Sequence, residues 1–134
     1  MRVLMVCLGN ICRSPMAEAV LAHLHPDWTV DSAGTGAWHV GERPDHRTLA
    51  ELKRHGIATA HRGRQVSSAD FTRFDLILAM DGQNLRDLQA IRPADATARL
   101  ELLDPDGVPD PYYDGPEAFA AIYTQIDRRC RMLA

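Results

Sequence analysis

Residues 7–15, with the sequence CLGNICRSP, place a thiol, a short loop, an arginine and a helix start within a few positions of one another. They follow the apolar run at residues 3–6, which predicts a buried strand that ends at the cysteine. Loop amides and a helix N-terminus that point at one spot favour a phosphate there, because unpaired N–H donors and the helix dipole attract negative charge. We therefore predict a phosphate-binding loop, which comprises Leu8, Gly9, Asn10, Ile11, Cys12, Arg13 and Ser14.

Cys7 is the candidate nucleophile at the start of this loop. A thiol at a helix N-terminus or beside a cation ionises more readily than a free thiol, so we expect Cys7 to be largely thiolate at neutral pH. Arg13 supplies a planar fork that grips two phosphoryl oxygens at once, a geometry that lysine lacks. The sequence leaves two roles open for Ser14, which either donates its hydroxyl to the sulfur or caps the helix.

The backbone of the loop needs residues that tolerate unusual angles. Gly9 and Asn10 are residue types that adopt positive φ, as a cradle of inward-facing amides requires. Pro15 suits the first position of a helix, where its fixed φ is already helical and its missing N–H has no partner to lose. This context favours a catalytic Cys7 over the alternative of an inert core thiol.

Hydrophobic periodicity predicts that strands and helices alternate along the whole chain. Strands are predicted at residues 2–8, 29–33, 75–80 and 99–103, and helices at 15–25, 48–55, 83–91 and 116–133. Gly56 lies in the helix-stopping position after the second helix. The alternation indicates a single α/β domain over residues 1–134, in which a four-stranded parallel sheet of flavodoxin-like winding carries helices on both faces. Ligands of such sheets bind at the carboxyl ends of the strands, where Cys7 lies.

Catalysis by Cys7 also needs a proton donor for the departing oxygen. Asp110 is a candidate because it lies in the loop after the last predicted strand, and Pro111 restricts its backbone to an extended form. Asp104 also precedes a proline and is an equal candidate on composition alone. The residues by themselves leave this choice open.

The motifs of the chain, taken in order, resemble those of the low-molecular-weight protein tyrosine phosphatases. The resemblance rests on residues 6–15, 30–35, 61–65, 80–81, 84–85 and 110–113 and covers nearly the whole sequence. It implies that Asp110, rather than Asp104, is the general acid beside Cys7 and Arg13. The implied reaction hydrolyses phosphotyrosine or small aryl phosphate monoesters through a phosphocysteine, releases inorganic phosphate, and uses neither a metal nor a cofactor.

The resemblance also implies two groups of residues around the loop. An aromatic rim that flanks the phenyl ring of the substrate comprises Trp38, Tyr112 and Tyr113. A hydrogen-bonding network that supports the loop comprises Asn10, Ser32 and His61. Independently of the resemblance, two cysteines within one tight loop suggest that Cys7 and Cys12 form a disulfide under oxidant, which thiols then reverse.

Composition limits the classes of partner and location. The net charge of −3 gives no reason to expect nucleic-acid binding, and we expect local positive charge at a few arginines only, namely Arg13, Arg62, Arg64 and Arg73. No apolar stretch is long enough for a membrane span, and no signal peptide is apparent. Three cysteines form no disulfide framework and fit no zinc spacing. We therefore expect a cytoplasmic protein. We also expect it to be a monomer, and we expect Cys130 to be a core residue, because it lies on the apolar stripe of the last predicted helix.

Three alternative functions remain on the sequence alone. Thiol-coupled arsenate reductases resemble this loop and fold, but they relay oxidation through mid-chain cysteines, and this chain has none between Cys12 and Cys130. Protein-arginine phosphatases of the same family carry threonine where this chain has Ile11, and the bulkier side chain favours phosphotyrosine. A noncatalytic phosphopeptide-binding module would need the cradle but neither Cys7 nor Asp110.

Overall fold

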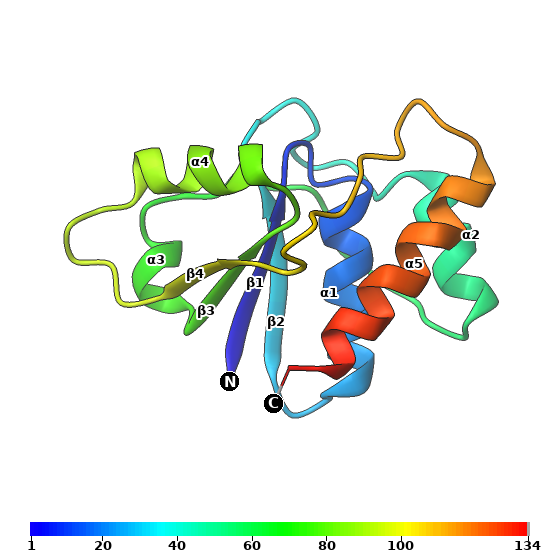
Figure 1. Cartoon of the computed structure of the whole chain (residues 1–134), viewed down its shortest axis with the longest axis horizontal. Helices are drawn as coiled ribbons and strands as arrows, with labels where there is room; N and C mark the ends of the chain where they lie inside the picture. The colour runs from blue at the N-terminus through cyan, green and yellow to red at the C-terminus, as the bar shows by residue number, and fades with distance from the viewer. Residues whose placement is uncertain (134) are drawn as a thin grey trace.

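Four parallel strands form the centre of the computed structural model, which describes residues 1–133 (Figure 1). They are β1 (Arg2–Cys7), β2 (Thr29–Gly34), β3 (Leu76–Ala79) and β4 (Arg99–Leu102), in the spatial order β2-β1-β3-β4. All neighbouring strands pair in parallel. Since β1 lies between β2 and β3, the winding direction reverses after β1, and ligands bind at such reversal points.

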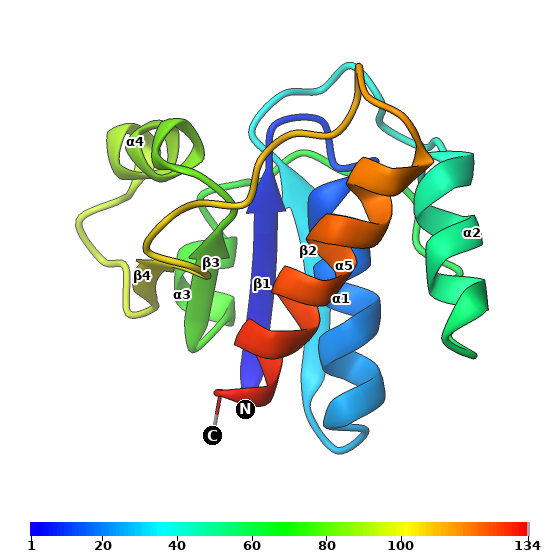
Figure 2. The same ribbon diagram turned by 45° about the vertical axis from the view of Figure 1, so that its right-hand side comes forward.

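Helices cover both faces of this sheet, as predicted (Figures 1 and 2). One face carries α1 (Arg13–Leu24), α2 (His46–Arg54) and α5 (Pro116–Arg131), and the other carries α3 (Asp70–Arg73) and α4 (Gly82–Ile91). Val3 and Met5 of β1 point to the first face, and Leu4 and Val6 to the second. All four side chains are fully buried, because a central strand covered on both sides has no solvent face. The predicted α/β fold is confirmed.

The starts of two helices differ from the sequence prediction. α1 begins at Arg13 rather than at residue 15, so Pro15 is the third helical residue and its predicted first position is wrong. The shift is tolerated because the N–H groups of the first helical turn have no partner within the helix. α2 begins at His46 rather than at residue 48, because the Asp45 carboxylate caps it by accepting from the Arg47 N–H at 2.8 Å.

The other elements lie within two residues of their predicted bounds, with one addition. The helix α3 has only four residues, too few to produce a periodic pattern in the sequence. Gly56 follows α2 with a φ of 74°, the left-handed conformation predicted for it. In the described part of the chain, no helix combines the length and the apolar character that crossing a bilayer requires.

The local positive charge predicted for several arginines is largely neutralised. Arg64 pairs with Asp31 and Asp70, each at 3.0 Å, and Arg73 lies 3.9 Å from the Asp70 carboxylate. Arg13 pairs with Asp81 at 2.7 Å. Each of these three arginines therefore lies beside a carboxylate, and Asp31 and Asp81 reach Arg64 and Arg13 from distant parts of the sequence.

Candidate active site

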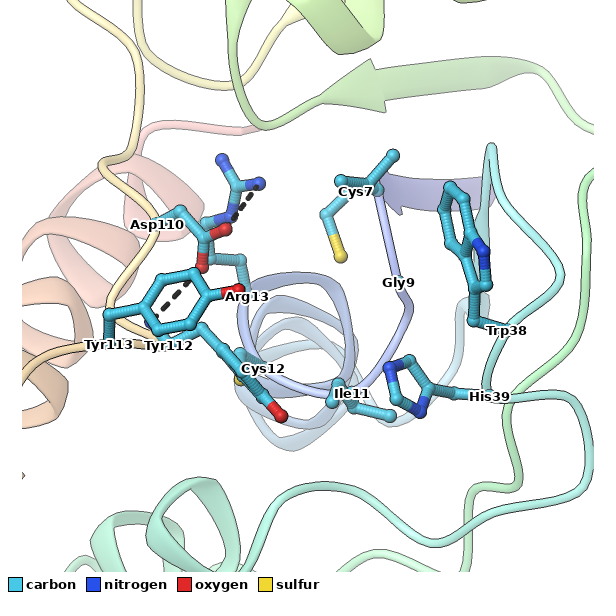
Figure 3. Close-up of a pocket in the computed structure, with 11 residues that line it drawn as sticks. Cys7, Gly9, Ile11, Cys12, Arg13, Trp38, His39, Asp110, Tyr112 and Tyr113 are labelled. Carbon is cyan, nitrogen blue, oxygen red and sulfur yellow. Dashed lines mark hydrogen bonds and ion pairs between the residues drawn. The ribbon is translucent and has the colours of Figure 1, made fainter.

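A pocket of about 270 Å³ opens at the carboxyl ends of the strands (Figure 3). Its walls come from the loops that follow β1, β2 and β4. The structure thus brings together the predicted nucleophile, arginine, acid and aromatic rim from segments far apart in the sequence. The residues that line the pocket are Cys7, Leu8, Gly9, Ile11, Cys12, Arg13, Trp38, His39, Asp110, Tyr112 and Tyr113.

The sulfur of Cys7 lies at the bottom of the pocket among hydrogen-bond donors. The side chain is 3 % exposed. Its Sγ accepts from the Asn10 N–H at 3.3 Å and lies 3.0 Å from the Ser14 Oγ. Because Ser14 Oγ itself accepts from Asn10 Nδ2 at 2.8 Å, its own hydrogen is free to donate to the sulfur. Ser14 is therefore placed to stabilise a thiolate. It does not occupy the N-cap position of α1, which is Cys12, and no side chain caps this helix start.

Asn10 holds the loop in shape through both its backbone and its side chain. Its φ of 57° is the left-handed conformation predicted for it. Its Nδ2 donates to Ser14 and to Ser32, and its Oδ1 accepts from His61 Nε2 at 2.8 Å and from the Arg64 N–H at 3.0 Å. All four hydrogen-bonding positions of this amide are thus used.

Gly9 serves the loop by its small size and not by its backbone angle. A positive φ was predicted for Gly9, and this prediction is wrong, since Gly9 is absent from the residues with positive φ. A Cβ at this position would lie 3.2 Å from Cδ2 of His39. The missing side chain therefore allows the His39 ring to lie against the loop, where it forms part of the pocket wall.

Behind the loop, Glu18 joins the predicted support residues. The Ser32 hydroxyl donates to Glu18 Oε1 at 2.7 Å, and His61 Nδ1 lies 3.0 Å from the same oxygen. Sequence analysis did not single out Glu18. Glu18 could have been found from its position four residues after Ser14 on the same helix, because residues i and i+4 share a helix face.

Glu18 and His61 also form the candidate metal site of the described residues, together with Asp31. Their ligand atoms lie within 4.8 Å of one another. The Asp31 carboxylate already accepts from Arg64 Nε at 3.0 Å, and Glu18 accepts from Ser32. The donor set is thus engaged in hydrogen bonds that hold the loop.

Arg13 is buried, and two groups that do not line the pocket hold its guanidinium. Its NH1 donates to Asp81 Oδ2 at 2.7 Å and to the Val108 carbonyl at 2.9 Å. Burial opposes ionisation of Asp81, but hydrogen bonds from Arg13 and from the Asn84 N–H outweigh it and hold the pKa of this carboxyl below its usual value. Asp81 was not predicted as a site residue, although it directly follows the strand β3, at the sheet edge where ligands bind.

The structure separates the two candidate acids. Asp110 lines the pocket, its side chain is 47 % exposed, and its Oδ2 lies 3.9 Å from Arg13 NH2 (Figure 3). Asp104 is buried and lines no part of that pocket. Hydrogen bonds from Gln125 and from the Asp106 N–H hold the pKa of Asp104 below its usual value. Asp104 is thus engaged in structural contacts, whereas the carboxyl of Asp110 lies in the pocket beside Arg13.

A sequence profile described as "Low molecular weight phosphotyrosine protein phosphatase" matches residues 2–134. The chain belongs to this family. A phosphatase of the same description from Schizosaccharomyces pombe is 48 % identical, over 93 % of this chain and 89 % of that protein.

Two solved structures have the same fold. The crystal structure of an arginine phosphatase from Drosophila is 43 % identical, with a TM-score of 0.92, over 98 % of this chain and 94 % of that one. A protein tyrosine phosphatase from Entamoeba histolytica, with Hepes in its active site, is 36 % identical, with a TM-score of 0.89, over 97 % of this chain and 92 % of that one. The recognition of the family from its motifs is confirmed.

In this low-molecular-weight phosphatase, aromatic side chains stand on opposite sides of the pocket mouth (Figure 3). Trp38 is 70 % exposed on one side. On the other side, the rings of Tyr112 and Tyr113 meet edge to face, with centroids 4.9 Å apart. Gly36 makes room for the indole, because a Cβ there would lie 1.9 Å from Cζ3 of Trp38. His39, which sequence analysis missed, forms the wall beside Trp38.

The two other cysteines of the phosphatase are thiols in different settings. Cys12 lines the pocket, and burial together with the negative charge of Asp45 raises its pKa to about 12. Cys130 lies in the hydrophobic core on α5, where burial raises its pKa to about 12. The prediction of Cys130 as a core residue is confirmed.

Proposed function

We propose that the protein hydrolyses phosphotyrosine in proteins, and small aryl phosphates, with Cys7 as the nucleophile. The observation that carries this proposal is the position of the Cys7 sulfur, which lies between two hydrogen-bond donors, Ser14 and the Asn10 N–H, in a pocket that also holds Arg13 and Asp110. The donors favour the thiolate form, which is the nucleophilic form of a cysteine.

In the first step, the Cys7 sulfur attacks phosphorus in line with the departing phenolic oxygen. A sulfur–phosphorus bond forms and the phosphorus–oxygen bond of the ester breaks. Arg13 and the loop amides stabilise the charge on the three remaining phosphoryl oxygens. Asp110 gives its proton to the departing oxygen, so that a neutral phenol leaves.

In the second step, water replaces the cysteine at phosphorus. Asp110, now ionised, takes a proton from the water as it attacks, and the sulfur–phosphorus bond breaks. Inorganic phosphate leaves and Cys7 returns as a thiolate. The same carboxyl thus acts as an acid and then as a base, and such help is typically worth about 10²–10⁴-fold in rate.

The walls of the pocket support phosphotyrosine as the substrate. Trp38 and the pair of tyrosines provide two flat surfaces between which a phenyl ring fits. The similarity to a Drosophila arginine phosphatase keeps phosphoarginine as the second candidate. Ile11 lines the pocket and favours the first candidate, because its apolar side chain offers nothing to a guanidinium group.

A substrate panel tests the proposed specificity. We expect the wild-type enzyme to hydrolyse a phosphotyrosine peptide with a kcat/KM at least about tenfold higher than for matched phosphoserine and phosphoarginine peptides, a difference of about 1.4 kcal/mol. Ile11→Thr should lower the ratio of kcat/KM for phosphotyrosine to that for phosphoarginine, because it places a hydroxyl where the wild type has an apolar wall. Release of inorganic phosphate measures each rate.

A wild-type preference for phosphoarginine would reject phosphotyrosine as the substrate. An unchanged ratio in Ile11→Thr would show that Ile11 does not determine the choice. Ile91→Thr is a matched control, because it makes the same substitution at an exposed position that does not line the pocket.

We also propose that Cys12 protects Cys7 from irreversible oxidation. Peroxide converts the Cys7 thiolate to a sulfenic acid, and the Cys12 sulfur then displaces hydroxide from it to form a disulfide. An external thiol reduces the disulfide and restores both cysteines. The shared pocket lining of the two residues supports this sequence of steps.

Peroxide treatment followed by dithiothreitol is expected to restore most activity in the wild type and little in Cys12→Ser. The pKa of Cys12, about 12, keeps this residue a thiol at neutral pH. Formation of the disulfide needs the Cys12 thiolate. Its rate should therefore rise about tenfold with each unit of increasing pH, up to the pKa of about 12. Trapping of the remaining Cys7 sulfenic acid with a dione at successive times measures how fast the disulfide forms. Wild-type enzyme that regains no activity with the reductant would contradict the proposal.

We place the enzyme in the cytoplasm. All three cysteines are free thiols, and a reducing compartment keeps a nucleophilic thiolate active.

A further inference from the structure

One arginine outside the pocket contacts the backbone that carries Asp110. Arg47 lies in the first turn of α2, and its guanidinium donates to two carbonyls of residues 110–114, here called the acid loop. Its NH1 donates to the Asp114 carbonyl at 2.7 Å and its NH2 to the Tyr112 carbonyl at 2.9 Å. The guanidinium also stacks on the ring of Phe119, 4.5 Å from the centroid.

The position of Arg47 is itself fixed by Asp45. The Asp45 carboxylate accepts from the Arg47 backbone N–H at 2.8 Å, and from Nε and NH2 at 3.0 Å each. Burial opposes ionisation of Asp45, but these hydrogen bonds outweigh it and lower the pKa of the carboxyl. A bidentate pair of this kind sets the direction of the guanidinium as well as its place.

The same helical turn also holds the phosphate-binding loop. The Asp45 N–H donates to the Ile11 carbonyl at 2.8 Å, and the Thr48 hydroxyl donates to the Cys12 carbonyl at 3.1 Å. The start of α2 therefore contacts the loop that carries the nucleophile and the loop that carries the acid. It fixes the distance between them.

The acid loop has few other ties. Its internal hydrogen bonds run from the Asp114 N–H to the Pro111 carbonyl and from the Tyr112 N–H to the Asp110 carboxylate. Among the described residues, the hydrogen bonds between the backbone of the loop and other elements all come from Arg47. Without them, the nearest ties of Asp110 to other elements would be its 3.9 Å ion pair with Arg13 and the hydrogen bonds of Val108 to Arg13 and to the Met80 carbonyl.

We propose that Arg47 is a positioning residue that holds the acid loop so that the Asp110 carboxyl reaches the leaving oxygen. This rests on the proposed role of Asp110 as the general acid. Proton donation matters most when the leaving group is a strongly basic oxygen and least when it departs as a stable anion. Loss of Arg47 should therefore affect phenyl phosphate more than p-nitrophenyl phosphate.

The test compares kcat/KM for these two esters in Arg47→Ala and Arg47→Lys. We expect Arg47→Ala to lower the value for phenyl phosphate by about 10- to 100-fold and that for p-nitrophenyl phosphate by less than about threefold. Arg47→Lys keeps the charge and most of the side-chain length, but the lysine cannot contact both carbonyls and Asp45 at once. It should therefore also lower kcat/KM more for phenyl phosphate than for p-nitrophenyl phosphate, but by less than Arg47→Ala does. Arg54→Ala, an exposed arginine of the same helix, is the matched control.

The Asp110→Asn background separates positioning from general stability. In Asp110→Asn, which lacks the acid, the addition of Arg47→Ala should lower kcat/KM for phenyl phosphate by less than about a further twofold. The reason is that both changes remove the same function, proton donation to the leaving oxygen. Two results would overturn the proposal. One is that Arg47→Ala lowers kcat/KM equally for the two esters. The other is that it lowers kcat/KM for phenyl phosphate as much in Asp110→Asn as in the wild type.

Two further outcomes are interpretable. If Arg47→Ala fails to fold, as thermal melting would show, Arg47→Lys decides by the same criteria. If Asp110→Asn itself affects both esters equally, the acid role of Asp110 fails, and with it the proposed mechanism, independently of Arg47.

Discussion

Cys7→Ser is expected to lower the turnover of p-nitrophenyl phosphate by about 10⁴-fold or more. Serine fits the space of the cysteine, but the same donors do not ionise a hydroxyl at neutral pH, so the nucleophile is lost while the cradle stays. Inorganic phosphate should therefore bind nearly as tightly as in the wild type. Steady-state kinetics measures the first effect, and calorimetric titration with phosphate measures the second.

A trapping experiment supports the interpretation of that variant. Wild-type enzyme quenched with acid during turnover should carry one phosphoryl group, and Cys7→Ser should carry none. Cys130→Ala is the control, since its thiol is buried in the core and does not line the pocket, so its loss should change stability but not the rate. A Cys7→Ser variant that keeps the wild-type rate would exclude the mechanism.

Arg13→Lys is expected to lower kcat/KM for aryl phosphates by about 10²–10⁴-fold. An ammonium group donates to one place at a time, whereas the guanidinium holds Asp81 and the Val108 carbonyl with one nitrogen and leaves its other donors for phosphate. The substitution also weakens the hydrogen bonds to Asp81 and to the buried Val108 carbonyl, so the melting temperature should fall. Kinetics and thermal melting measure the two effects together.

Arg99→Lys controls for the loss of a guanidinium as such. Arg99 is an exposed residue of β4 that pairs with Glu101 on the surface, and such pairs contribute little. Both variants keep the net charge of the protein. An Arg13→Lys enzyme with the wild-type kcat/KM would show that a point charge is sufficient and that the fork geometry is not used.

The sequence predicted those features that depend on local pattern. The continuous apolar run of β1 indicated a central strand, and the residue types between Cys7 and Ser14 indicated a phosphate cradle. Both depend on neighbours in the chain, so a single sequence carries them. The choice of Asp110 over Asp104 was different, because two Asp-Pro pairs look alike until the fold places one in the pocket and the other under α5.

The partners of the predicted residues were the part that the sequence could not supply. Asp81 supports Arg13 from the end of β3, and Glu18 of α1 contacts Ser32 and His61 behind the loop. These contacts join segments that are distant in the sequence. The same holds for Asp31, which pairs with Arg64 across 33 positions of the sequence. Long-range pairing of charges depends on tertiary structure, and no periodicity records it.

The full set of hydrogen bonds around the Asn10 amide has a consequence for product inhibition. A cradle that is already in shape loses little conformational entropy when a phosphate binds. It offers the same contacts to inorganic phosphate as to the phosphoryl group of an ester, so the product competes with the substrate for the resting enzyme. We therefore expect the aromatic rim, which only the ester reaches, to discriminate between them and so to set how much free phosphate the enzyme tolerates.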